Sequence, residues 1–535
     1  MPSRIVSSGR QSKCVYGSTS GIGLPMSLRS DHTMDQRGPG CAGETRPRCS
    51  ALMKFLGHLT ASLAAALVLA GSASAVDVGV VDDYGIAPAN SPGFLDTVVA
   101  LGMRENRLSI PWDPAAPTTI QNQQALEQYM MLATLRGLRV VFTVTPTKAT
   151  AITSDPGAAG AYVAFLQQLA RSFAMVKDFV VGNEPNQPRF WQPQFGRRGQ
   201  PLSPAAYYAL LARSYDGLKG VNPEITVIGL GLSPRGNDQP KARENVSISP
   251  VRFLNGLGKA YRRGGRRKPI MDALSFHPYP DRDRDSLMKG YRWPNAGIPN
   301  LGRIKQAFWD AFHGTPQPTF REGRSRGSLT LRLGEIGWQV GVLPGSAGAY
   351  YGRESVRPTD EATQAGIYAQ AVRYLACDAS VQSMLFFLLR DEPDLERWQA
   401  GLVRADGTAR PSFESVKATI AQTSGRCAGR SRSWRHSTKV AGARIRFPRT
   451  RVFPAGKRVL ALVGNAQEDA LVDAQLYRGS RRVVRRTTSV KAYRSQTIRF
   501  STRLRPGRYT FRVRFRAAVN PSRSERFSGP LRILR

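Results

Sequence analysis

The chain has 535 residues, of which 41% are hydrophobic and 21% are charged. This composition argues against wholesale disorder, and the length leaves room for one large domain and a smaller one. The formal net charge is +39, and it is unevenly distributed. From residue 430 to residue 535 there are 28 Lys and Arg against 4 Asp and Glu, a net charge of +24. Such an excess fits an anionic partner or a solvated surface, and charge alone identifies no partner.

Residues 53–75 have the pattern of a secretory signal peptide. A basic start at Lys54 precedes a short apolar stretch, and the segment ends in an A-x-A cleavage site at 73–75. The apolar stretch is shorter than the roughly 20 residues of a membrane span. We therefore expect a secreted protein, extracellular or associated with the cell envelope, without a transmembrane segment after cleavage. The alternative is a retained membrane anchor.

Residues 1–52 precede this signal, although a signal peptide belongs at the N-terminus. They are polar, rich in Gly and Ser, and show no hydrophobic period. We predict that translation begins at Met53 and that residues 1–52 are a mis-assigned extension. Cys377 and Cys427 are then the two cysteines of the mature chain, and in an oxidising compartment they form either a disulfide or two buried free thiols.

From residue 76 onward, short apolar runs alternate with segments of helical period such as 160–173 and 204–219, the latter with Ser203 as its expected N-cap. The expected strands are 78–81, 106–110, 139–145, 179–182, 226–230, 273–276, 331–334 and 383–388. Eight such units predict an α/β fold, a (β/α)₈ TIM barrel over residues 76–425. An open doubly wound sheet would need a Gly-rich phosphate loop after its first strand, and 78–85 has none.

Two glutamates stand where barrel strands end. Asn183-Glu184-Pro185 follows the fourth strand, and Glu335 follows the seventh. In a barrel these ends share one mouth, so both carboxylates should face a common cleft. A pair of carboxylates across a cleft is what glycoside hydrolysis requires, one as proton donor and one as nucleophile or base.

With these motifs the region 76–421 resembles the clan A glycoside hydrolases, which include cellulase-like and xylosidase-like enzymes of families 5 and 39. The resemblance implies that Glu184 is the acid/base and Glu335 the nucleophile of a retaining mechanism. It also implies that Asn183 bonds the sugar 2-hydroxyl.

Three further residues match the clan pattern. Arg107, on the second strand, would hold Glu335 ionised by charge pairing. His277 and Tyr279 form the His-x-Tyr motif after the sixth strand. The resemblance implies that Tyr279 bonds Glu335 and that His277 lines the cleft near Glu184.

The aromatic platform for the sugar departs from the clan pattern, which places a Trp at the end of the eighth strand. This chain has Phe386-Phe387-Leu388 there. We expect Trp338 or Trp398 to provide the stacking surface instead. Trp112 and Trp191 could also stack on sugar rings or pack under loops. No Cys or His cluster has metal-ligand spacing, so no metal or other cofactor is implied.

The C-terminal region predicts a linker at 426–438 and a basic all-β sandwich at 439–535. In this region apolar and basic residues alternate, as in 509–515, which is typical of strands with one buried face. The sandwich could bind carbohydrate, hold an anionic cell-envelope polymer, or act as a spacer. We expect no nucleic-acid partner, because the chain is exported and has no recognition motif.

The sequence therefore predicts a secreted retaining glycoside hydrolase that acts on the O-glycosidic bonds of a polysaccharide or oligosaccharide. The alternative is a noncatalytic glycan-binding or envelope protein on the same barrel. The pair Glu184 and Glu335 favours the enzyme.

Overall fold

The computed structural model describes residues 75–321, 327–447, 452–456, 459–501 and 503–534. The predicted extension 1–52 and the signal peptide, apart from Ala75, lie outside the described residues. In the part that the structure describes, no helix has the length and apolar character to cross a membrane.

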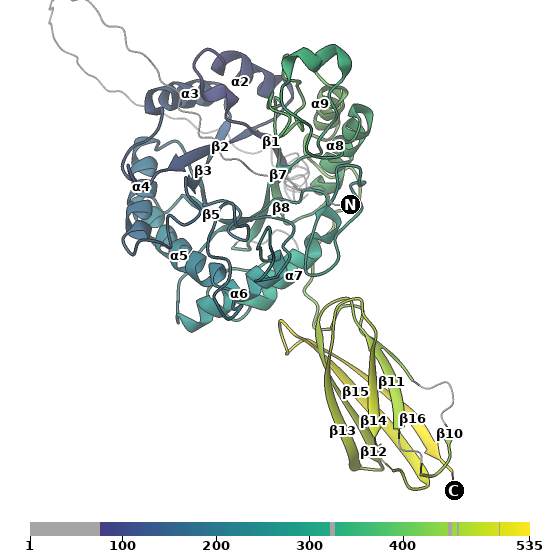
Figure 1. Ribbon diagram of the computed structural model, residues 1–535. Coiled ribbons are helices and arrows are strands. Elements are labelled where there is room, and N and C mark those ends of the chain that lie inside the picture. The colour runs from purple at the N-terminus through teal and green to yellow at the C-terminus, as the bar shows by residue number, and fades with distance from the viewer. Residues whose placement is uncertain (1–74, 322–326, 448–451, 457–458, 502, 535) are drawn as a thin grey trace, which may run out of the picture. The chain divides into compact units, whose positions relative to one another are not determined.

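The first of two folded regions is a closed barrel of eight parallel strands (Figure 1). The strands are β1 (Asp77–Val81), β2 (Glu105–Trp112), β3 (Arg139–Pro146), β4 (Asp178–Val181), β5 (Thr226–Leu232), β6 (Ala273–Phe276), β7 (Thr330–Ile336) and β8 (Val381–Phe386). Each strand pairs with the next along the chain, and β1 also pairs with β8, which closes the sheet. The predicted TIM barrel is confirmed.

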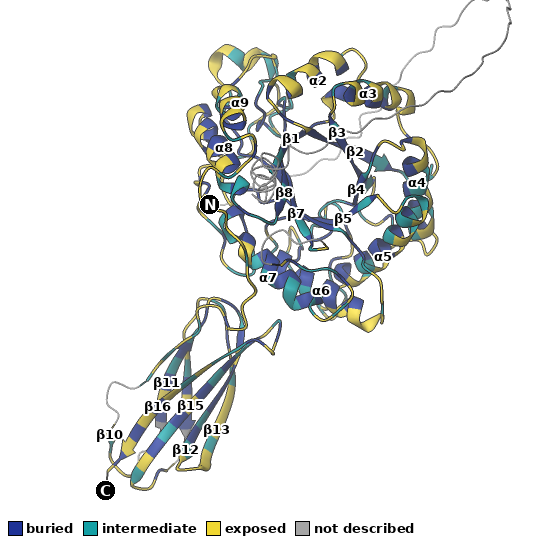
Figure 2. Ribbon diagram, turned by 180° about the vertical axis from the view of Figure 1, so that it is seen from behind, coloured by how far each residue is buried: buried dark blue, intermediate teal, exposed yellow. Residues whose placement is uncertain are grey.

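Helices surround the barrel, with their buried stripes against the strands and their exposed faces outward (Figure 2). They are α2 (Ser91–Ala100), α3 (Gln123–Leu135), α4 (Ala158–Ser172), α5 (Ser203–Val221), α6 (Pro250–Arg263), α7 (Leu301–Phe312), α8 (Glu361–Ala376) and α9 (Pro411–Thr423), with short 3-10 turns η1 (Tyr84–Ile86), η2 (Ile298–Asn300) and η3 (Pro344–Ala349). The packing follows from the sequence period. In α4, for example, Tyr162, Phe165 and Leu169 are buried on one side.

The expected N-cap at Ser203 is wrong. Ser203 is the first residue of α5, and no side chain caps this helix. Its hydroxyl donates instead to Gln194 Oε1 at 3.1 Å, in the loop that leads from β4 to α5. The Ser203 hydroxyl therefore bonds Gln194 instead of capping the helix.

A buried ion-pair network joins the N-terminal ends of the strands, opposite the barrel mouth. Arg332 of β7 contacts Asp178 of β4 at 2.6 Å and Glu105 of β2 at 3.3 Å, and Arg139 of β3 contacts Glu105 at 3.1 Å. Buried charges of this kind are costly unless they are paired. Here they are paired, and they tie distant strands together at the end of the barrel where catalysis is not expected.

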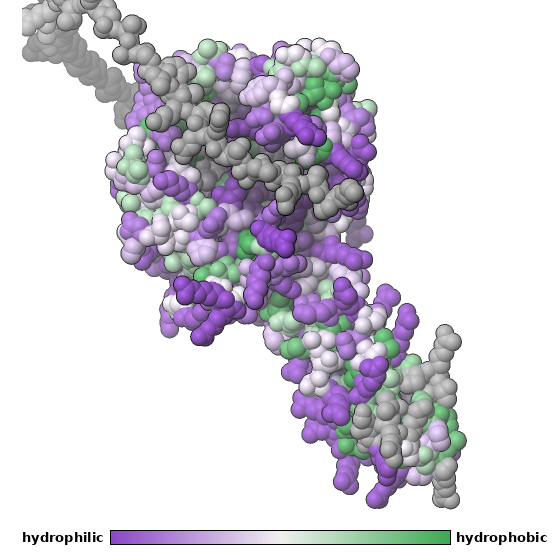
Figure 3. All heavy atoms as spheres, viewed as in Figure 1, coloured by the Kyte–Doolittle hydropathy of each residue, from purple (hydrophilic) through white to green (hydrophobic). Residues whose placement is uncertain are grey.

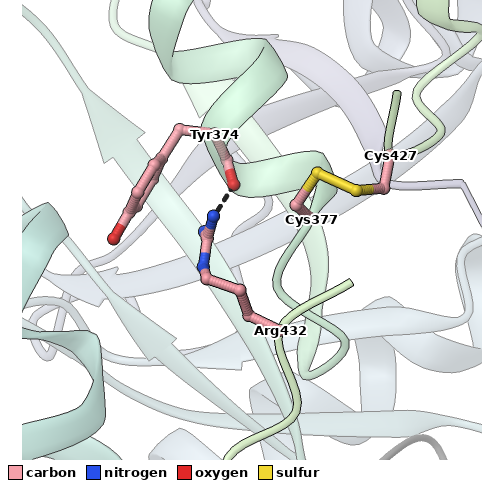
Figure 4. Close-up of a disulfide and its surroundings, with 4 residues drawn as sticks. All are labelled: Tyr374, Cys377, Cys427 and Arg432. Atoms are coloured by element: carbon pink, nitrogen blue, oxygen red, sulfur yellow. Dashed lines mark hydrogen bonds between the residues drawn. A yellow bond between two sulfur atoms is a disulfide. The ribbon is translucent and has the colours of Figure 1, made fainter. Parts of the chain in front are cut away.

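A disulfide between Cys377 and Cys427 attaches the predicted linker to the end of α8 (Figure 4). Arg432 adds a second attachment. Its guanidinium lies over the Tyr374 ring, 3.8 Å from the centroid, and donates to the Tyr374 carbonyl oxygen at 2.6 Å. Of the two alternatives for the cysteines, the structure contains the disulfide. The first residues of the linker are therefore held against the barrel.

Removing this disulfide should destabilise the chain. The bond closes a loop with a sequence separation of 50, for which loss of loop-closure entropy predicts about 4 kcal/mol of unfolding free energy. We expect a Cys377→Ala/Cys427→Ala variant of residues 76–535 to show this loss in denaturant unfolding. A reductant should destabilise the parent chain and leave the variant unchanged. Two titratable thiols in the unreduced parent would contradict the pairing.

The second folded region is a small β-sandwich, as predicted. Its strands are β9 (Arg444–Arg446), β10 (Val452–Phe453), β11 (Val459–Asn465), β12 (Ala470–Arg478), β13 (Arg481–Val490), β14 (Gln496–Ser501), β15 (Gly507–Ala517) and β16 (Ser524–Ile533). One sheet has the order β10-β16-β15-β12-β13, and the other has the order β14-β11-β9. Their inner faces share one core, in which Phe500 of the smaller sheet and Phe511 of the larger lie 5.5 Å apart between ring centroids.

Candidate active site

Arg107 lies at the centre of the barrel mouth, and every N–H of its guanidinium has a partner. Nε donates to Thr143 Oγ1, Nη1 to the Gly334 carbonyl oxygen and to His277 Nε2, and Nη2 to Asn183 Oδ1 and Glu335 Oε1. These partners come from β3, β7 and the loops after β4 and β6. A planar guanidinium with five fixed donors can hold all of them in one geometry, which a lysine could not do.

Gly334 makes room for this arrangement. A Cβ atom at Gly334 would lie 2.6 Å from Ser275 Oγ, 2.9 Å from His277 Nε2 and 3.1 Å from Arg107 Nη1. A side chain at this position would therefore displace the groups that organise the site. Gly334 was not among the predicted site residues, although a glycine inside a strand next to a candidate nucleophile is a signal of close approach.

Glu335 lies near the end of β7 with 8% of its surface exposed. Oε1 accepts from Arg107 Nη2 at 2.9 Å, and Oε2 accepts from the Tyr279 hydroxyl at 2.8 Å. Burial alone would raise the pKa of Glu335, but the neighbouring His277 and Arg107 and the hydrogen bonds to the carboxylate hold it below its usual value. Glu335 is therefore kept ionised.

Glu184 follows β4, and its surroundings shift its pKa in the opposite direction from that of Glu335. Burial raises its pKa, the nearby charge of Glu335 raises it further, and the hydrogen bond from His277 offsets part of the rise. Its backbone has φ of +36°, in the left-handed region that a residue with a side chain rarely adopts. The backbone N–H of Glu184 donates to the Gly231 carbonyl oxygen at 3.1 Å, which helps to hold this conformation. Strained backbone of this kind is concentrated at functional sites.

His277 connects the two glutamates. Its Nδ1 lies 3.1 Å from Glu184 Oε1 and 3.4 Å from Glu335 Oε2, and its Nε2 lies 3.3 Å from Arg107 Nη1. Because a guanidinium nitrogen can only donate, Nε2 must be the acceptor. Nδ1 therefore carries the ring proton and donates to Glu184. The tautomer of His277 is set by Arg107.

The side chains Glu184, His277 and Glu335 place one ligand atom each within 4.8 Å of one another. Such a group has the residue types of a metal site. Its hydrogen bonding argues against that use, because the Nδ1 atom that faces both carboxylates carries a proton. The positive charge of the Arg107 guanidinium, beside Glu335, would also repel a metal cation bound there. The geometry fits an acid and a nucleophile better than a metal ligand set.

The remaining predicted site residues divide into two groups. Asn183 and Tyr279 lie beside the glutamates, and Asn183 Oδ1 accepts from Arg107 Nη2 at 3.2 Å. The prediction for Trp338 is wrong. Trp338 is 2% exposed, and its indole N–H donates to the Asp285 carbonyl oxygen at 2.9 Å, so neither face is open to a sugar.

Trp112 and Trp191 are also buried, with 1% and 3% of their surfaces exposed. Trp112 packs edge to face against Tyr162, and Trp191 packs edge to face against Tyr207. Of the two alternatives for these residues, the structure therefore contains packing rather than sugar stacking.

Two aromatic side chains do lie beside Tyr279. Trp398 has its ring centroid 4.8 Å from that of Tyr279, and Phe387 has its centroid 5.4 Å from that of Trp398. Both are partly exposed. Phe387 follows β8 directly, at the strand end where the clan pattern places a Trp. Trp398 was one of the two expected stacking residues, and Phe387 was not predicted for this role.

Acidic groups continue around the mouth. Asp83, after β1, accepts from the Ser109 backbone N–H at 2.8 Å, and its carboxylate lies within electrostatic reach of Arg107 and Glu392. Burial raises the pKa of Asp83, and the charge of Glu392 adds to this rise. Around Arg107 the described residues thus include the carboxyl groups of Asp83, Glu184 and Glu335. Glu392 acts on Asp83 and itself pairs with Arg397 at 3.2 Å.

No family model matches the sequence, and no curated protein matches it either. Among solved structures, the chain is similar to a monomeric beta-xylosidase from Caulobacter crescentus CB15, with 14% identity, 80% of this chain and 94% of that chain covered, and a TM-score of 0.42. It is also similar to a glucosidase from Croceicoccus marinus, with 14% identity, 80% and 93% coverage and a TM-score of 0.44.

A third similar structure is the exo-beta-1,4-mannosidase Op5Man5 from Opitutaceae bacterium strain TAV5. Its identity is 14%, its TM-score is 0.40, and the match covers 66% of this chain and 60% of that one.

Proposed function

We propose that the chain is a retaining glycoside hydrolase in which Glu335 is the nucleophile and Glu184 the acid/base. One observation carries the proposal. The buried Glu335 and the partly buried Glu184 have carboxyl oxygens within 4.8 Å of each other, and their surroundings shift the two pKa values in opposite directions. Retaining enzymes need carboxyl groups roughly 5 to 5.5 Å apart, because both act on one anomeric centre without a water between them.

The first step forms a covalent intermediate. The ionised Glu335 attacks the anomeric carbon while Glu184 gives its proton to the glycosidic oxygen, whose bond to carbon breaks. The leaving sugar departs as an alcohol, and Glu184 becomes a carboxylate. The Nδ1–H of His277, 3.1 Å from Glu184 Oε1, stabilises that new charge.

In the second step Glu184 takes a proton from a water molecule, which attacks the anomeric carbon and displaces Glu335. Two displacements restore the original anomeric configuration. With its oxygen held by Arg107, Asn183 has its amide NH₂ left to donate to the sugar, in accord with the expected contact to a 2-hydroxyl. Tyr279 positions Glu335 through its hydroxyl.

The charge of the cleft favours a neutral sugar. Asp83 lies near both Arg107 and Glu392. Arg107 already pairs with Glu335, and Glu392 pairs with Arg397 at 3.2 Å. A uronic acid in this position would find the guanidinium of Arg107 already paired and would bring its carboxylate near the charge of Glu335, at a cost in like-charge repulsion. We therefore propose a neutral O-linked polysaccharide or oligosaccharide as the substrate.

We also propose that the protein is exported and remains near a cell envelope. The signal-like segment at 53–75 supports export. The basic C-terminal sandwich supports attraction to an anionic envelope polymer.

The test is the configuration of the first product. Residues 76–535 would be screened against β-glucan, xylan, mannan and neutral aryl glycosides, and the anomer of the product followed by proton NMR. We expect retention. An inverted product would contradict the double displacement, and a folded chain inactive on every glycan would favour the noncatalytic glycan-binding alternative.

Replacing His277 should shift both the acid and the basic limb of the pH profile of activity. The reaction needs Glu335 ionised and Glu184 protonated, so activity rises above the pKa of Glu335 and falls above that of Glu184. His277 lowers the pKa of both, because its Nδ1–H faces both carboxylates. A His277→Phe variant should therefore lose activity and show both limbs of kcat/KM at higher pH. If kcat/KM falls and neither limb moves, His277 has only a packing role.

Trp398 should contribute to binding the sugar. Because its ring lies beside Tyr279 and is partly exposed, we expect Trp398→Ala to weaken binding by about 1 to 2 kcal/mol, that is, to raise KM roughly 5- to 30-fold. Trp338→Phe should lower the melting temperature with a smaller change in KM. Equal KM values for the parent and Trp398→Ala would place the stacking surface elsewhere.

A further inference from the structure

The outer face of the larger sheet of the sandwich carries a regular array of arginines. In β15, Tyr509, Phe511, Val513 and Phe515 are buried in the sandwich core. Since side chains alternate between the two faces of a strand, the residues at the even-numbered positions from 508 to 516 point outward. These include the four arginines Arg508, Arg512, Arg514 and Arg516.

Strand register extends this array across neighbouring strands. Arg514 is opposite Arg526 of β16 on one side and Asp473 of β12 on the other. Arg512 is opposite Gln475, which is in turn opposite Arg485 of β13. Directly opposed residues in antiparallel strands share a face. We define the arginine face by the six residues Arg485, Arg508, Arg512, Arg514, Arg516 and Arg526.

Little negative charge compensates this array. Asp473 lies on the same face and pairs with Arg485 at 2.9 Å. Counting these seven described residues, six arginines and one aspartate, the local net charge is +5. Arginines so close together repel one another, and a bound anion would reduce this repulsion. Hydrophilic side chains are prominent on the visible side of this domain in Figure 3.

We propose that the arginine face binds a linear acidic polysaccharide whose sugars carry carboxylate groups. Neighbouring strands are roughly 4.8 Å apart, and every second residue along a strand repeats at roughly 6.8 Å. The face is therefore a grid of positive charges that an extended chain with regularly spaced anions can follow. Each guanidinium can bond a carboxylate through two parallel N–H groups.

A nucleic acid fits this surface less well. Binding of single strands relies on aromatic side chains on which the bases stack. The aromatic residue in these outward rows is Tyr477, opposite Thr510, and the guanidinium of Arg512 covers its ring at 4.3 Å from the centroid. A membrane surface also fits less well, because the large exposed apolar side chains described on this sheet, Leu471, Val483 and Val452, lie on three different strands rather than in one patch.

The choice of a polysaccharide rests in part on the proposed function, because an exported glycosidase meets mixed glycans. The catalytic cleft would cut a neutral glycan, while the arginine face would hold an acidic one. The two surfaces would thus keep the enzyme within a matrix whose anionic component it does not cut.

Binding of the full chain to polygalacturonate tests the proposal, with the fully methyl-esterified polymer as the uncharged match. Titrations between 20 and about 300 mM salt would give the dissociation constant and its salt dependence. We expect tight binding to the acid form, no binding to the ester, and a steep loss of affinity as salt rises.

The variant Arg508→Gln/Arg512→Gln/Arg526→Gln removes three charges that are exposed on the face. The control Arg171→Gln/Arg263→Gln/Arg267→Gln removes three exposed charges from the barrel region. We expect the first variant to bind at least about tenfold more weakly with a salt slope smaller by about 2, and the control to match the parent.

Equal weakening in both variants would mean that net charge alone drives binding, and would overturn the proposal. So would tighter binding at equal salt to single-stranded DNA or to vesicles containing anionic lipid. Hydrolysis is measured separately on a neutral aryl glycoside. A chain that binds polygalacturonate but hydrolyses no glycan would overturn only the proposed function. An active enzyme that does not bind polygalacturonate would overturn only this inference.

Discussion

Replacing Glu335 with alanine should lower kcat/KM at least about ten thousand-fold, while Glu184→Ala should cost much less on a substrate with a good leaving group. The difference follows from their roles. Without Glu335 no covalent intermediate forms. Without Glu184 an activated aryl glycoside such as a dinitrophenyl glycoside, which needs no protonation on leaving, can still react with Glu335.

Azide separates the two roles further, because it can act as an external nucleophile. In Glu335→Ala it should attack the substrate directly and give a glycosyl azide of inverted configuration. In Glu184→Ala it should attack the covalent intermediate and give an azide of retained configuration. Melting temperatures close to that of the parent would show that both variants are folded. The same azide configuration from both variants would contradict the assignment of acid and nucleophile.

The barrel was predictable because its strands contain short apolar stretches. Parallel strands buried on both faces need such runs, and β4 (Asp178–Val181) and β6 (Ala273–Phe276) carry them. The ends were less predictable. β7 continues to Ile336, two residues beyond the expected end, so Glu335 lies within the strand rather than after it. Strand ends depend on pairing with neighbours, which a local pattern does not contain.

Much of the site was also predictable, because the residues of catalytic type follow strands whose ends meet at one mouth. Glu184, Glu335, Arg107, His277 and Tyr279 are brought together as expected. What the sequence did not reveal is how they share protons. The tautomer of His277 depends on which atom of Arg107 faces it, and that is a property of packing.

The aromatic residues were predicted less well, for a physical reason. An indole can pack in the hydrophobic core or stack on a sugar ring, so the sequence around a Trp does not distinguish these two roles. Trp338 directly follows the Glu335 segment, yet its ring lies against Tyr368 of α8 and its N–H is used by a backbone carbonyl. Trp398 is far from the motifs in sequence but close to Tyr279 in space.

Arg107→Lys should reduce kcat/KM by about a hundredfold or more and move the acid limb of the pH profile to higher pH. Lysine keeps the charge but has three donors on one atom, so it cannot satisfy the five partners of the guanidinium. The hydrogen bond and close charge that hold the Glu335 pKa down would be weakened. Because Glu335 must be ionised to attack, a higher pKa means that activity is lost on the acid side at a higher pH.

A matched control distinguishes this effect from general damage to the barrel. Arg332 is a second buried arginine inside the sheet, and it pairs with Asp178 and Glu105 at the opposite end of the barrel from the mouth. Arg332→Lys should lower the melting temperature and leave the acid limb where it is, whereas Arg107→Lys should move the limb. If both variants lose stability and neither shifts the limb, Arg107 supports the fold without tuning Glu335. A shift confined to Arg107→Lys would show that one side chain couples the packing of the barrel mouth to the ionisation of the nucleophile.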